Sequence, residues 1–87
     1  MRTDQEILND AADRASQILR IPHTYLDKVK FIQLFYLIHN VMGGDVELMR
    51  HWLNTHNFHL GFAPASRLTD EASLDKVIGY LESFVDG

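Results

Sequence analysis

The segment that most constrains the fold of this chain is the apolar run between positions 29 and 42, which reads VKFIQLFYLIHNVM. Its apolar side chains have helical spacing but cover more than one face of the helix that they predict. Such a helix is either the central element of its domain or lies partly in an interface between subunits. In a single domain of 87 residues both can apply. We therefore predict a homo-oligomer that associates through the helix 29–42.

Helical signals also cover the first half of the chain. Thr3 and Glu6 have the spacing of a capping box, which predicts a helix over about 4–20. Pro22 ends that helix and suits the first turn of the next one, which we expect over 22–42. After two glycines, Asp45 is a favourable N-cap for a short third helix.

The pattern in the second half of the chain predicts an irregular stretch at 54–63, a helical turn at 64–68 and a last helix at 71–85. Gly79 lies inside this last helix at a cost of about 1 kcal/mol relative to alanine, which indicates either the close approach of another backbone or plain tolerance. No segment alternates with period two for long enough to predict a strand. The predicted fold class is all-α: a small compact single domain of about four to five helices, with residues 1–30 packed against residues 31–87.

Composition and charge exclude several classes of protein. The chain has no cysteine, which excludes disulfides and thiolate sites and fits a reducing compartment. No apolar run approaches the roughly 20 residues of a membrane span, and the N-terminus is too polar for a signal peptide, so we expect a cytoplasmic protein without membrane contact. The net charge is −4, and residues 31–87 are strongly acidic, so nucleic-acid binding is not expected.

The sequence offers little for catalysis or metal binding. His51, His56 and His59 cluster, but their spacing matches no metal motif, so we predict no metal and no cofactor. The serines lack the strand-turn-helix context of an activated nucleophile, and acids at the start of the last helix are explained by the helix dipole. We therefore predict that the chain is not an enzyme.

The aromatic residues of the segment 50–64 leave alternatives open. Trp52 on a short helix is a core residue or a binding hot spot. Asn57 in a loop suits hydrogen bonds to neighbouring backbone. Phe58 and Phe62 form an apolar surface for a partner or cap the core.

Several residues of the C-terminal two thirds resemble a known family. The pattern W-L-x3-N-x2-L-G-x2-P, followed by V-x2-Y-L, is similar to the toxin-binding domain of the Xre/MbcA/ParS antitoxin family over about residues 31–87. The positions that match are Trp52, Leu53, Asn57, Leu60, Gly61, Pro64, Val77, Tyr80 and Leu81.

The resemblance implies an antitoxin that binds and neutralises a cognate RES-type toxin, an enzyme that degrades NAD, through its C-terminal region. The matching positions would shape the module, and Phe84, Val85, Asp86 and Gly87 would contact the toxin. Glu82 and Asp86 would favour a positively charged pocket. With Phe58 and Phe62, these residues are the predicted toxin-binding candidates.

Residues 11–30 are similar to the opening of the helix-turn-helix part of longer family members, but the segment that would supply a recognition helix is missing. One alternative is nevertheless a DNA-binding regulator with a degenerate helix-turn-helix, whose phosphate contacts would be Arg14, Arg20, Lys28 and Lys30. The other is a stand-alone helical adaptor.

Overall fold

The structure is a computed structural model that describes residues 2–22 and 27–85. Its elements are α1 (Asp4–Leu19), α2 (Lys28–Val41), α3 (Val46–Asn54), the 3-10 turn η1 (Pro64–Arg67) and α4 (Glu71–Val85). Within these residues the only extended pairing is an isolated bridge between Asn57 and Phe62. The prediction of an all-α domain is therefore confirmed.

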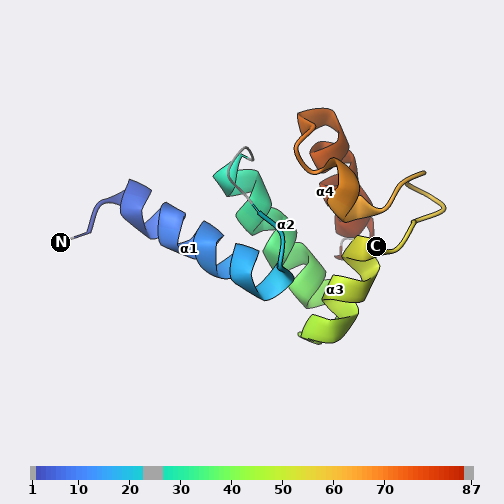
Figure 1. Ribbon diagram of the computed structural model, residues 1–87, viewed down its shortest axis with the longest axis horizontal. Helices are drawn as coiled ribbons and strands as arrows, with labels where there is room; N and C mark the ends of the chain where they lie inside the picture. Colours follow the sequence, from blue (N-terminus) through green and yellow to red (C-terminus); the bar gives the residue numbers. More distant parts are fainter. Residues whose placement is uncertain (1, 23–26, 86–87) are drawn as a thin grey trace.

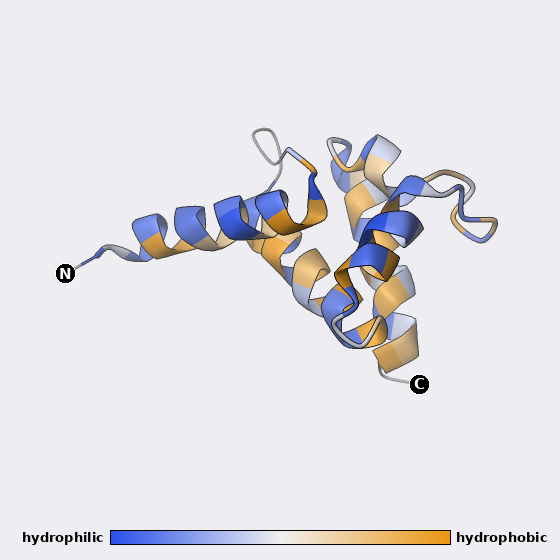
Figure 2. Ribbon diagram, turned by 60° about the horizontal axis from the view of Figure 1, so that its bottom comes forward, coloured by the Kyte–Doolittle hydropathy of each residue, from blue (hydrophilic) through white to orange (hydrophobic). Residues whose placement is uncertain are grey.

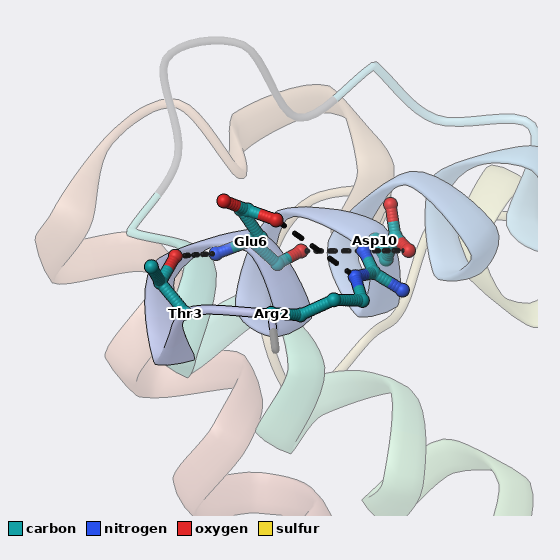
Figure 3. Close-up of polar contacts among 4 residues, drawn as sticks. All are labelled: Arg2, Thr3, Glu6 and Asp10. Atoms are coloured by element: carbon teal, nitrogen blue, oxygen red, sulfur yellow. Dashed lines mark hydrogen bonds and ion pairs between the residues drawn. The ribbon is translucent and has the colours of Figure 1, made fainter.

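Local side chains explain where the first two helices begin and end. Thr3 accepts a hydrogen bond from the backbone N of Glu6 and caps α1 (Figure 3). Arg20 ends α1 because its backbone is left-handed, with φ of 59°. The second helix begins at Lys28 rather than at the predicted residue 22, since Asp27 is its N-cap and accepts from the backbone N of Lys30 at 3.1 Å. Pro22 lies outside both helices.

The polar N-terminus of α1 is held by an arginine that reaches along the helix. The guanidinium of Arg2 lies 4.0 Å from the carboxylate of Glu6 and also pairs with Asp10 (Figure 3). The first turns of α1 are thus tied together by their own side chains. Such exposed pairs contribute little to the stability of the whole domain.

Helix α2 is the central element of the domain. Its residues Phe31, Leu34 and Ile38 are fully buried. The helix contacts α1, α3 and α4, and Figure 1 shows α1 and α4 on opposite sides of it. Of the two interpretations of the apolar run at 29–42, the structure confirms the central element of the domain.

The molecule is elongated, with extents of 44, 26 and 24 Å. The N-terminal half of α1 extends beyond the other helices, and Figure 2 shows apolar residues continuing along one side of this projecting part. None of the helices in residues 2–22 and 27–85 combines the length and apolarity that a membrane crossing needs.

Two glycines with open space around them make a matched pair for mutation. A Cβ added at Gly79 meets no atom within 4 Å, so of the two interpretations of this helical glycine the close approach of a backbone is wrong within the described chain. Gly61 also has open space, but its φ is +85°.

We predict that Gly79→Ala raises the free energy of unfolding by up to about 1 kcal/mol, because alanine loses less conformational entropy on folding. Gly61→Ala is expected to lower it by about 1–2 kcal/mol, because an L side chain is strained at that φ. Urea denaturation followed by circular dichroism measures both. Changes of the same sign would contradict the prediction.

Candidate functional site

The loop after α3 is closed into a tight turn that displays one aromatic residue. The side chain of Asn57 accepts from the backbone N of Leu60 at 3.0 Å. The backbone of Asn57 accepts from Gly61 N at 2.8 Å and donates to the carbonyl of Phe62 at 3.1 Å. This turn protrudes from the helices (Figure 1), and Phe58 at its tip is 90% exposed. The chain therefore presents a phenyl ring to solvent on a hydrogen-bonded turn.

Phe62 has the opposite environment. It is only 8% exposed and belongs to the hydrophobic core. The guanidinium carbon of Arg67 lies 5.1 Å from its ring centroid, and Nζ of Lys76 lies 5.7 Å from it. The ring therefore caps the core and is covered by two cations, which leaves it no free face as the predicted partner contact.

An aromatic cluster links this turn to α3 and α4. Tyr80 lies at its centre, stacked on Trp52 with ring centroids 6.3 Å apart and on His59 with centroids 5.9 Å apart. Phe84 contacts Tyr80 edge to face at 5.1 Å, and Phe58 contacts His59 edge to face at 6.2 Å. We call these five residues the aromatic surface. Trp52 is half-buried, so it both packs within the domain and contributes to this surface.

The aromatic surface continues into a shallow hollow at the C-terminal ends of α2 and α4. The hollow has a volume of about 440 Å³ and is lined by Asn40, Val41, Phe84 and Val85. Phe84 is 59% exposed, and Val85 is also exposed. The hollow is open, and its walls are polar and apolar in about equal share, because Asn40 lies beside Val41, Phe84 and Val85. Such an open hollow suits a protein side chain better than a small substrate, which is usually held in an enclosed pocket.

The remaining predicted contact residues are Glu82, Asp86 and Gly87. Glu82 is half-buried on α4. Asp86 and Gly87 lie outside the described residues.

Most of the other residues that matched the family pattern are buried and pack beside the elements that carry the aromatic surface. Five of them are buried in the core: Leu53, Leu60, Pro64, Val77 and Leu81. Lys76 adds a hydrogen bond from its Nζ to the carbonyl of Leu60 at 3.1 Å, which ties the turn to α4. The position of the aromatic surface thus depends on packing between α3, η1 and α4.

The stack of Trp52, His59 and Tyr80 was not predicted from the sequence. Tyr80 and Phe84 stand four residues apart, which places both on one face of α4 and was a usable signal. His59 was rejected as a metal ligand and interpreted as a polar loop residue, whereas its ring stacks on Tyr80. No group of three or more His, Asp or Glu that could hold a metal occurs among residues 2–22 and 27–85.

The basic residues considered for DNA contacts are partly engaged within the chain. Nζ of Lys30 lies 2.7 Å from Oε1 of Glu71 and 2.9 Å from Oδ1 of Asp75. Hydrogen bonds from Lys30 to these two carboxylates raise its pKa above the ordinary value. Lys28 donates to the side chain of Asn9. The other two residues are Arg14, which lines a groove between α1 and α2, and Arg20, which is exposed.

Comparison with known proteins adds no family. Neither the scan against protein-family models nor the search of curated proteins gives a match for this chain.

Proposed function

We propose that this chain is a helical protein-binding module of the antitoxin type, which neutralises a RES-type toxin through the aromatic surface and the adjoining hollow. The single observation that carries the proposal is the exposure of Phe58 and Phe84 on one continuous aromatic surface at the end of α4. The resemblance to the Xre/MbcA/ParS toxin-binding domain assigns toxin contact to the same end of the chain.

The physical properties of this region suit a protein partner. Aromatic residues are enriched at binding hot spots, because they bury a large area with few rotatable bonds. The hollow beside Phe84 and Val85 offers a site into which a side chain of the partner can insert, with Asn40 available for a polar contact. Glu82, on the same helix, adds negative charge for a positively charged active-site entrance. Binding there would cover the entrance of a toxin without any chemistry by the antitoxin.

The test is co-expression of this chain with a RES-type toxin encoded beside it. The full chain is expected to restore growth and cellular NAD and to copurify with the toxin. A chain lacking residues 82–87 is expected to do neither, because it loses Phe84 and one wall of the hollow. Circular dichroism of the shortened chain checks that the helices remain.

Other outcomes favour the other candidates. If neither chain restores growth while both stay folded, the adaptor alternative gains over toxin neutralisation. A DNA titration at low salt tests the regulator. Binding that weakens steeply with salt would favour phosphate contacts by the basic residues of 11–30.

A further inference from the structure

A second apolar region lies on the other side of α2 from α4. Ile7 and Ile18 are exposed on α1, and Val29 and Tyr36 are exposed on α2. Between the two helices runs a groove of about 250 Å³, lined by Ala11, Arg14, Ala15, Ile18, Ile32, Phe35 and Tyr36. Ile7 is 53% exposed. The N-terminal half of α1 projects beyond the other helices (Figure 2).

One stripe of α1, in which Ile7, Arg14 and Ile18 are exposed and Ala11 is half-buried, has a symmetric spacing. Its residues Ile7, Ala11, Arg14 and Ile18 are separated by four, three and four positions and therefore lie along one face of the helix. The spacing reads the same in both directions about a centre between residues 12 and 13. A second α1 packed antiparallel on this centre places Ile7 of each copy against Ile18 of the other. This is the self-complementary contact that a twofold axis requires.

The charges of α1 favour the same antiparallel arrangement. Residues 4–13 contain four acids, whereas residues 14–20 contain Arg14 and Arg20 and no acid. An antiparallel pair therefore brings the acidic half of each helix beside the basic half of the other.

Arg14 fits the same arrangement. Among residues 2–22 and 27–85, it has no hydrogen bond or ion pair. The twofold centre sets Asp10 of the second copy level with residue 15, within reach of Arg14. The side chain of Asp10 is 45% exposed although it pairs with Arg2, so it remains accessible.

We propose that the chain forms a twofold dimer in which the α1 stripes of two copies pack antiparallel, flanked by Val29 and Tyr36 of α2. The contact is thus centred on α1, whereas the sequence placed it on 29–42. Because α1 and α4 lie on opposite sides of α2, the dimer leaves both aromatic surfaces free (Figure 1). The proposal does not depend on toxin binding.

Cysteine cross-linking tests the register directly, because the natural chain has no cysteine. In the double variant I7C/I18C, the thiol at position 7 of each copy faces the thiol at position 18 of the other, so mild oxidation is expected to give a covalent dimer. Positions 7 and 18 of one helix are about 16 Å apart at 1.5 Å per residue, too far for a disulfide within one chain. The single variants I7C and I18C are the matched controls. In each of them the two thiols, one from each copy, lie about 16 Å apart along the helix axis, so no disulfide is expected.

A charge swap tests the ion pair in the uncross-linked protein. In sedimentation equilibrium, Arg14→Asp is expected to raise the dimer dissociation constant by about tenfold to a hundredfold, and D10R/R14D to recover most of that loss. Phe58→Ala is the control on the other surface and is expected to change nothing.

Three results would overturn the proposal. The first is a monomer at all concentrations, and the second is efficient cross-linking of I7C or I18C alone, which indicates a parallel pair. The third is a dimer that Phe58→Ala weakens and Arg14→Asp does not.

Discussion

Phe31→Ala is expected to lower the free energy of unfolding by about 3–5 kcal/mol, because it leaves a cavity in the centre of the domain. Phe31 is fully buried on α2, the helix that contacts α1, α3 and α4. A domain of this size has about 4–13 kcal/mol of stability in total, so the loss is a large share of it. The midpoint of thermal unfolding should fall by about 15–30 °C.

The control is Phe58→Ala, which removes the same side chain from a position that is 90% exposed. Its expected effect on stability is within about 0.5 kcal/mol. Both variants are measured by urea denaturation at one protein concentration, because association would otherwise shift the midpoint. Equal shifts for the two variants would mean that α2 is not the central helix.

The double variant F58A/F84A is expected to abolish copurification with the toxin while the fold is retained. Truncation of a central aromatic hot spot costs about 2 kcal/mol or more, so two of them should raise the dissociation constant by about a hundredfold or more. Both side chains are exposed, and neither belongs to the buried core. Growth rescue should be lost together with binding.

Leu48→Ala provides a matched control for this loss. Leu48 is an exposed apolar residue on α3 that belongs to neither the aromatic surface nor the groove between α1 and α2. Its removal should leave toxin binding unchanged. Toxin binding by F58A/F84A at the strength of the natural chain would remove the aromatic surface from the proposed function and leave only the charged residues near Glu82.

The elements of the fold were largely predictable from the sequence, because helix periodicity and caps are local signals. Thr3 and Asp45 cap α1 and α3 as predicted, and the last helix spans the predicted residues. The start of α2 was missed because Pro22 also suits a first helical turn, whereas the cap is formed by Asp27. The two possible starts, at Pro22 and at Lys28, are distinguished by the hydrogen bond of the N-cap side chain of Asp27.

The candidate site was harder to predict, because it depends on contacts between distant segments. Phe58 and Phe62 have the same chemistry and stand four residues apart, yet one is exposed and the other lies under Arg67 and Lys76. The direction of each ring is set by the turn that Gly61 allows and by the packing of α4. Neither can be deduced from the spacing of aromatic residues alone.

The closed turn at 57–62 also has a consequence for the affinity of a complex. Its backbone is held by hydrogen bonds within the turn and by Lys76, so Phe58 is already presented before a partner arrives. Little conformational entropy then has to be lost at the moment of binding. Asn57→Ala should loosen the turn but keep the Phe58 ring. We therefore expect this variant still to bind the partner, with lower affinity. Selection could thus change the affinity for a partner through the rigidity of this turn, without changing the residues that contact the partner.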